Sequence, residues 1–191
     1  PQREAMIHIF FGERTAGKIL DVPKDTETQK IGSAGVVGSG TMGGGIAMNF
    51  ANAGIPVIVL DQDEKNLERG IGVIEKNYQM MVDRGRLSQE MKDGVMSLIT
   101  PSLNYEDLAD CDIVVEAVYE NLDLKQEIFK KLDDVVKGDS ILASNTSGLD
   151  IDAISSATER PEKVVGTHFF SPANIMRLLE IVRGEKTSKE T

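Results

Sequence analysis

The 191-residue sequence contains one cysteine and no tryptophan, and aromatic residues make up only 5% of it. A single cysteine, Cys111, cannot form a disulfide within the chain, which excludes a disulfide scaffold and favours a reducing compartment. Because Cys111 precedes an apolar run, we expect it to be a half-buried small side chain rather than a reactive thiol. The length is sufficient for one domain with a sizeable apolar core.

Long apolar runs and an excess of positive charge are also missing. No run of about 18 apolar residues occurs, so we expect no membrane span. The N-terminus lacks the pattern of a secretory signal, and we expect a cytoplasmic protein, with the peroxisome as the alternative. The sequence has 21 Lys and Arg against 31 Asp and Glu, a formal net charge of −10. Such a charge repels phosphate backbones, so nucleic acid is not an expected partner.

Short apolar runs alternate with helical periodicity along most of the chain. Runs such as IVLD and IVVEAV lack the alternation of a half-buried strand, which is typical of a parallel sheet covered on both faces. This order predicts a doubly wound α/β sheet. The expected strands are 34–38, 56–61, 112–118, 140–144, 163–168 and 178–183, and the expected helices between them are 42–53, 63–84, 89–98 and 122–136.

The first 30 residues have a different character. Residues 1–18 predict a short helix, and residues 21–30 form a polar block that contains Pro23 and is typical of a linker. We therefore divide the chain into an N-terminal linker helix and linker, residues 1–30, and a sheet domain, residues 31–191.

Three glycines follow the first expected strand at G-x-G-x-x-G spacing: Gly38, Gly40 and Gly43. The spacing alone is weak, because glycine turns are common. Its place between a strand and a helix strengthens it, since Gly38 allows a tight turn, Gly40 admits a pyrophosphate and Gly43 lets the helix pack closely. The helix N-terminus then offers N–H groups and a partial positive charge to the phosphates. We therefore predict a Rossmann-type dinucleotide site on a mostly parallel sheet.

Asp61 ends the second expected strand, 18 residues after Gly43. A carboxylate there accepts the ribose hydroxyls of adenosine and repels a 2′-phosphate, so it favours NAD over NADP. Two alternatives remain at this stage. Asp61 could cap the next helix, although Asp63 is available for that role, and the loop could also hold FAD.

The chain has two histidines, His8 in the N-terminal helix and His168 near the carboxyl end of an expected strand. We expect His8 to be a surface residue. Doubly wound sheets bind ligands at the edge where His168 lies. If 163–168 and 178–183 pair antiparallel around a turn centred on Asn174, Glu180 stands opposite His168 on the same face. A histidine held by a buried carboxylate is a well-placed general base.

Four separated segments, GSGTMGGGIA, VVEAVYENLDLKQEIF, ASNTSGL and GTHFFSPANIMRLLEIV, resemble the NAD-binding domain of L-3-hydroxyacyl-CoA dehydrogenase, over residues 31 to about 191. The segment IHIFFGERTAGKI is similar to the connecting segment of multifunctional β-oxidation enzymes, in which an enoyl-CoA hydratase domain precedes the dehydrogenase. The resemblance implies a piece of such a fusion, without the hydratase domain and without the helical domain that follows the sheet domain and supplies much of the acyl-CoA cleft.

The resemblance also implies roles for individual residues and NAD as the cofactor, with an acyl-CoA substrate. His168 matches the catalytic base, Glu180 its carboxylate partner, and Ser147 the hydroxyl that contacts the substrate oxygen. One position departs from the matrix-type enzymes, which carry asparagine where this chain has Ser171; the fusions often have serine there. No metal is implied. The implied cofactor-binding residues are Gly38, Gly40, Thr41, Met42, Gly43, Asp61, Gln62, Ala117, Glu120, Lys125 and Asn145.

The activity implied is NAD-dependent oxidation of (3S)-3-hydroxyacyl-CoA to 3-ketoacyl-CoA in fatty acid β-oxidation, with this chain as the cofactor-binding half. Two alternatives are a non-catalytic NAD-binding or interaction module and a 3-hydroxybutyryl-CoA dehydrogenase of butanoate metabolism.

Overall fold

A computed structural model of the chain describes residues 1–19 and 21–191, which form two compact units, residues 1–29 and residues 30–189. The first unit contains one helix, α1 (Gln2–Ala16), none of whose residues is buried. This confirms the helix expected over residues 1–18, and His8 is exposed on it as expected. Within the described ranges, no helix has the length and apolarity that a membrane span needs.

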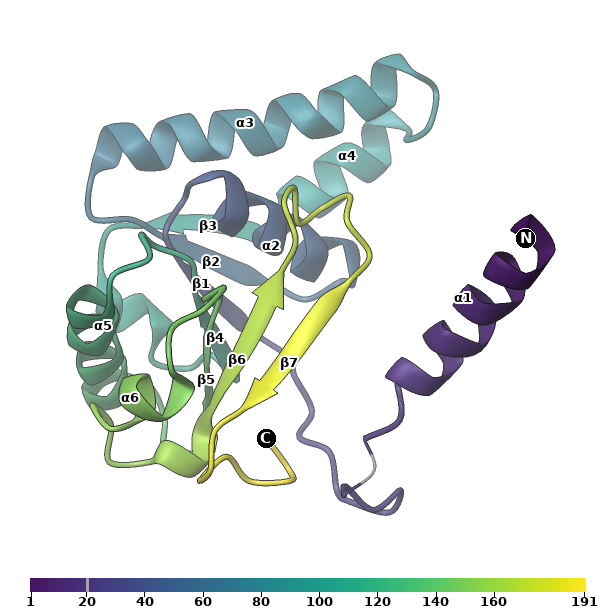
Figure 1. Ribbon diagram of the computed structural model, residues 1–191. Helices are drawn as coiled ribbons and strands as arrows, with labels where there is room; N and C mark the ends of the chain where they lie inside the picture. Colours follow the sequence, from purple (N-terminus) through teal and green to yellow (C-terminus); the bar gives the residue numbers. More distant parts are fainter. Residues whose placement is uncertain (20) are drawn as a thin grey trace. The chain divides into compact units, whose positions relative to one another are not determined.

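The second unit is built on a seven-stranded sheet of order β3-β2-β1-β4-β5-β6-β7, in which every neighbouring pair is parallel except β6 and β7 (Figure 1). The doubly wound, mostly parallel sheet is thus confirmed, and each expected strand forms within two residues of its expected limits. The strands are β1 (Ala34–Val37), β2 (Val57–Leu60), β3 (Ile99–Ser102), β4 (Ile113–Glu116), β5 (Ile141–Ser144), β6 (Val164–Phe169) and β7 (Leu179–Arg183).

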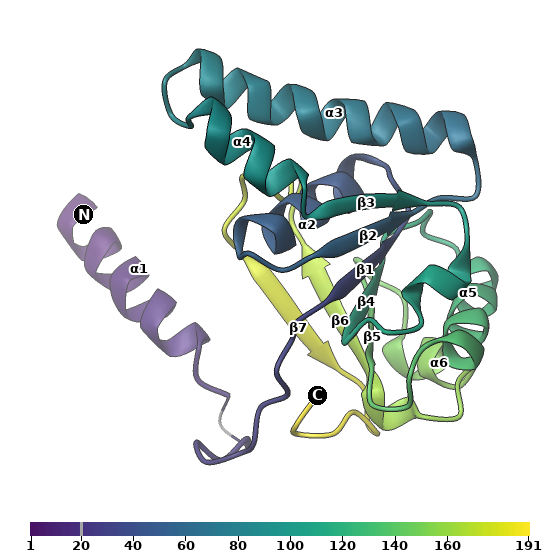
Figure 2. The ribbon, with the colours of Figure 1, turned by 180° about the vertical axis from the view of Figure 1, so that it is seen from behind.

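Helices cover both faces of the sheet, as Figures 1 and 2 show. On one face, Ile46, Ile74 and Tyr78 join the strand residues Val36 and Val59 in one buried apolar cluster. On the other, a second cluster contains Phe129, Leu132, Ile154, Val114 and Leu142. The first face carries α2 (Thr41–Asn52), α3 (Glu64–Asp83) and α4 (Gln89–Met96), and the second carries η1 (Tyr105–Leu108), α5 (Leu122–Val135) and α6 (Ile151–Ser155), with the short turn η2 (Pro161–Lys163) before β6.

The helix starts follow the capping residues in the sequence. The side chain of Asp63 accepts a hydrogen bond from the Asn66 amide at the start of α3, and Ser88 does the same for the Met91 amide at the start of α4. These side chains satisfy amide groups that have no partner inside the helix. Of the two aspartates that could cap α3, Asp63 is therefore the one that does so.

One strand, β3, was missed by the sequence analysis. It pairs with β2 at the edge of the sheet, with Pro101 opposite Val59 and Ser102 opposite Leu60. A proline inside a strand lacks the N–H that a central strand needs, so it is tolerated only at an edge. The run ITPS is also too short and polar to stand out by its apolar pattern, and only pairing with β2 makes it a strand.

The strand order reverses between β1 and β4. From β1 the chain proceeds outward to β2 and β3, and from β4 it proceeds outward the other way to β5 and β6. In sheets of this kind, ligands bind in the crevice at the carboxyl ends of the strands, at the point of reversal. The glycine loop follows β1 and the segment that begins with Ala117 follows β4, so both lie at this crevice.

Candidate active site

Two of the three glycines of the loop are required by the packing of the protein itself. Gly38 has φ +104°, and a Cβ added to it would lie 2.8 Å from the carbonyl oxygen of Ala117. A Cβ on Gly43 would lie 1.8 Å from the carbonyl oxygen of Gly38. The tight turn and the close approach of α2 to the loop therefore both depend on glycine, as the motif predicts.

Gly40 differs from the other two, because a Cβ added to it meets no atom within 4 Å. Its backbone, with φ −67° and ψ −170°, is open to any residue. Gly40 is the N-cap of α2 and no side chain caps that helix, whereas α3, α4 and α5 each have a side-chain cap. The start of α2 thus offers free N–H groups beside open space, an arrangement that fits a pyrophosphate.

Asp61 lies directly after β2 and is held by the glycine loop. Its Oδ2 accepts hydrogen bonds from the Ser39 amide at 3.0 Å and the Ser39 hydroxyl at 2.6 Å, and its Oδ1 accepts one from the Asp63 amide at 3.2 Å. Burial raises the pKa of Asp61, but the hydrogen bonds from Ser39 and from the backbone outweigh it, so the pKa lies below its ordinary value. The carboxylate is therefore ionised at neutral pH and carries the charge that disfavours a 2′-phosphate.

A cleft of about 810 Å³ begins at this loop. Its size is that of a cofactor site. Its lining continues through Tyr119, Leu124 and Ile128 on one side and through Pro172 and Asn174 on the other. Seven of the predicted cofactor residues line it: Gly38, Gly40, Thr41, Met42, Asp61, Gln62 and Ala117.

We expect Asp61→Asn to lower the affinity for NAD about tenfold and to weaken the preference for NAD over NADP by at least as much, since a charged acceptor is lost and repulsion of the 2′-phosphate disappears. Dissociation constants for both cofactors, from calorimetry, give the ratio. Asp63→Asn is the matched control, because asparagine caps a helix as well as aspartate does. An unchanged ratio in Asp61→Asn would contradict the role of Asp61.

His168 and Glu180 meet across the β6–β7 hairpin. They are directly opposite each other in the register, and His168 Nδ1 lies 2.8 Å from Glu180 Oε2. An ionised carboxylate can only accept, so Nδ1 is the donor in this pair, and the neutral imidazole tautomer that fits this bond has its lone pair on Nε2. The predicted pairing is confirmed, but the expectation of a buried carboxylate is wrong: the Glu180 side chain is 52% exposed and that of His168 is 20% exposed. The reason is that β7 is the edge strand and every one of its residues is exposed.

The loop of this hairpin packs against the cofactor helix. The Asn49 side-chain amide of α2 donates to the carbonyl oxygen of Ala173 at 3.0 Å. A Cβ on Gly45 of α2 would lie 3.0 Å from the Ala173 Cβ and 3.1 Å from the Asn174 amide nitrogen, so glycine allows this close contact. The strand pair that holds His168 is therefore anchored to the helix that begins at the glycine loop.

The loops after β4 and β5 hold the other predicted residues. Glu120 Oε1 accepts hydrogen bonds from the amides of Ser147, at 2.9 Å, and Gly148, at 3.3 Å. Asn145 Oδ1 accepts from the Phe169 amide at 2.9 Å, which ties the loop after β5 to the end of β6 beside His168. Ser147 is exposed.

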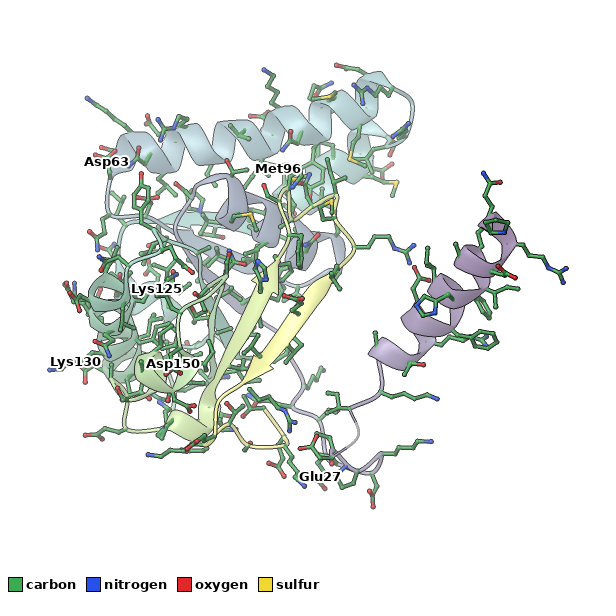
Figure 3. All side chains as sticks on the ribbon, viewed as in Figure 1. Glu27, Asp63, Met96, Lys125, Lys130 and Asp150 are labelled. Atoms are coloured by element: carbon green, nitrogen blue, oxygen red, sulfur yellow. The ribbon has the colours of Figure 1, made fainter. Side chains whose placement is uncertain are left out.

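Lys125 is placed differently from what a direct cofactor contact would require. Its side chain has no exposed surface and lies between α5 and the sheet, while Lys130 of the same helix points outward (Figure 3). It forms ion pairs with Glu116 at 2.7 Å and Glu120 at 3.4 Å. In this arrangement, any influence of Lys125 on a bound cofactor acts through Glu120.

The sequence analysis missed three polar residues that organise the site: Ser39, Glu116 and Thr146. Ser39 holds Asp61, and Thr146 donates to Glu120. Glu116 is fully buried at the end of β4. A signal for it was present, because a glutamate inside the apolar run IVVEAV must find a partner when it is buried. Ser39 and Thr146 gave no such signal.

Residues 33–191 match the family described as "3-hydroxyacyl-CoA dehydrogenase, NAD binding domain". The chain belongs to this family. The resemblance read from the motifs is thereby confirmed, and three relatives illustrate it.

The chain is 42% identical over 190 residues to the fatty acid oxidation complex subunit alpha of Psychrobacter cryohalolentis, a match that covers 100% of this chain and 26% of the relative. It is 44% identical over 188 residues to a peroxisomal fatty acid beta-oxidation multifunctional protein of Arabidopsis thaliana, covering 98% of this chain and 26% of the relative. The fold is similar to that of (S)-3-hydroxybutyryl-CoA dehydrogenase from Ralstonia eutropha, with a TM-score of 0.81 and 36% identity over 83% of this chain and 56% of that one. This dehydrogenase-family chain thus spans about a quarter of the length of the Psychrobacter and Arabidopsis relatives.

Proposed function

We propose that this chain is the cofactor-binding half of an enzyme that oxidises (3S)-3-hydroxyacyl-CoA to 3-ketoacyl-CoA with NAD, a reaction of fatty acid β-oxidation. The observation that carries the proposal is the His168–Glu180 pair, 2.8 Å apart, on a hairpin whose loop packs against the cofactor helix α2. The oxidation of an alcohol by NAD requires a general base and a dinucleotide-binding site that are held in a fixed position relative to each other.

The residues of the chain divide the work of this reaction. Bound NAD supplies the acceptor for the hydride that leaves C3 of the substrate. His168 Nε2 takes the proton of the 3-hydroxyl, so that the C3–O bond becomes a carbonyl. Glu180 stabilises the imidazolium that forms and keeps Nε2 turned away from itself. The exposed hydroxyl of Ser147 donates a hydrogen bond to the same substrate oxygen.

The cofactor-binding residues divide by the part of NAD that they hold. Gly40 and the amides at the start of α2 take the pyrophosphate, and Asp61 takes the adenosine ribose. Glu120 and Asn145 stand at the ends of β4 and β5, nearer to His168 along the sheet, and take the nicotinamide side. An ionised Asp61 supports NAD over NADP.

A further domain covers the hairpin in this proposal. The strand β7 and the segment before it expose apolar side chains on both faces of the hairpin that carries the His168–Glu180 pair, among them Ile175 at 69%, Leu178 at 52% and Ile181 at 53% exposure. Several exposed large apolar side chains gathered on one edge hairpin are typical of a surface that another domain covers. We infer that residues 31–191 pair with a helical domain that supplies the other wall of an acyl-CoA cleft, and that residues 1–30 connect to a hydratase domain.

The test is an absorbance assay of NAD reduction by the full-length protein that carries this chain. We expect NADH to form only when (3S)-3-hydroxyacyl-CoA is present, and the (3R) epimer to be inert. NAD binding without any acyl-CoA-dependent absorbance change would favour a non-catalytic module instead. The similarity to (S)-3-hydroxybutyryl-CoA dehydrogenase makes the four-carbon substrate a necessary part of the series, because a preference for it over longer chains would assign a short-chain enzyme.

A further inference from the structure

Glu116 and Lys125 form a fully buried ion pair near the ends of β4 and β5, and neither side chain has exposed surface. Both carboxylate oxygens of Glu116 contact the ammonium nitrogen, Oε1 at 2.7 Å and Oε2 at 2.9 Å. Such a pair contributes little net stability, because the cost of removing two charges from water offsets their attraction. Its place beside the site calls for a role other than stability.

The pair connects the strands that bear the site. Glu116 Oε1 also accepts from the Val118 amide at 2.8 Å, and Oε2 accepts from the Ser144 hydroxyl at 2.7 Å. One carboxylate therefore ties the segment after β4 to the last residue of β5. The lone pairs of Glu116 are occupied by these four contacts, which fixes the position of the Lys125 ammonium.

Lys125 extends the connection to Glu120, whose Oε2 lies 3.4 Å from the ammonium nitrogen. The other oxygen of Glu120 accepts from the Thr146 hydroxyl and from the Ser147 and Gly148 amides. Burial raises the pKa of Glu120, but these hydrogen bonds and the Lys125 charge outweigh it and lower the pKa overall. Glu120 is thus an ionised link between Lys125 and the loop that carries Ser147.

We propose that Glu116 is a positioning residue: it clamps Lys125, which fixes Glu120, which in turn fixes the backbone of Ser147 and Gly148. Without the Glu116 charge, Lys125 is a buried cation with Glu120 as its ion-pair partner, and it draws Glu120 away from the loop. The catalytic consequence rests on the proposed function, since it is the dehydrogenation that depends on where Ser147 stands.

The test is Glu116→Gln in the full-length protein, read in two ways. We expect kcat for the hydroxyacyl-CoA substrate to fall about 10- to 100-fold with little change in KM, because misplacement of a substrate-positioning loop by about 1 Å has effects of that size. We also expect hydrogen exchange at the Ser147 and Gly148 amides to become about tenfold faster, since they lose their acceptor. Exchange in β1 should stay unchanged.

Lys92→Met is the matched control. Lys92 is another buried lysine paired with a glutamate, Glu75, at 3.3 Å on the α3–α4 surface away from these loops. We expect this variant to change stability without changing exchange at Ser147 and Gly148. If Glu116→Gln does not fold, the double variant Glu116→Gln/Lys125→Met removes both buried charges. It is tested by the same two measurements, kcat and hydrogen exchange at Ser147 and Gly148, because Glu120 then lacks the Lys125 ammonium that fixes its position.

The outcomes separate the two proposals. Faster exchange at Ser147 and Gly148 in a protein that shows no dehydrogenase activity at all would support the positioning role and remove the proposed function. A folded variant with unchanged kcat and unchanged exchange at these amides, in an active enzyme, would overturn the positioning role alone.

Discussion

Replacement of His168 by alanine should lower kcat for (3S)-3-hydroxyacyl-CoA by about 10²- to 10⁴-fold, the range typical of a lost general base. The dissociation constant for NAD should not change, because His168 is not among the residues that line the cleft at the glycine loop. Steady-state kinetics of the full-length protein gives kcat, and calorimetric titration gives the dissociation constant for NAD.

His8→Ala is the control for this experiment, because His8 is the only other histidine and is exposed on α1. Glu180→Gln keeps an acceptor oxygen for Nδ1 but removes the charge, and we expect a smaller loss, on the order of tenfold. Wild-type turnover in His168→Ala would exclude His168 as the base.

Replacement of Gly40 by alanine should weaken NAD binding about 100-fold, or about 2.7 kcal/mol, while the fold remains intact. The added methyl group meets no protein atom within 4 Å, so it enters only the space that a pyrophosphate would fill. Calorimetric titration with NAD gives the affinity, and thermal unfolding without NAD shows whether the fold is intact. Gly40→Ser adds a second arm, since serine is a favoured N-cap and should preserve α2 while blocking the same space.

Substitutions at two other glycines serve as controls for this experiment. Gly138→Ala also adds a methyl group to open space, but away from the cleft, and should leave NAD binding unchanged. Gly43→Ala should unfold or strongly destabilise the chain, because its Cβ would lie 1.8 Å from the Gly38 carbonyl oxygen. If Gly40→Ala bound NAD as tightly as wild type, the pyrophosphate would have to lie elsewhere.

Local patterns in the sequence were sufficient to predict most of the strands and helices. Buried parallel strands appear as unbroken apolar runs, and helices begin at side chains such as Asp63 and Ser88 that can accept their first amides. The pairing of His168 with Glu180 was also predictable, because residues that stand directly opposite each other in an antiparallel hairpin point to the same face.

What the sequence by itself determined were the features that depend on neighbours in the chain: every strand except β3, most of the helices, the glycine turn and the histidine–glutamate pair. Tertiary structure decided the features whose partners lie far away in sequence. The strand β3 exists only because β2 offers an edge, and the exposure of Glu180 follows from the place of β7 at the other edge. The burial of Glu116 with Lys125 depends on α5 packing over β4, because a charge is stable in an apolar interior only when an opposite charge meets it there.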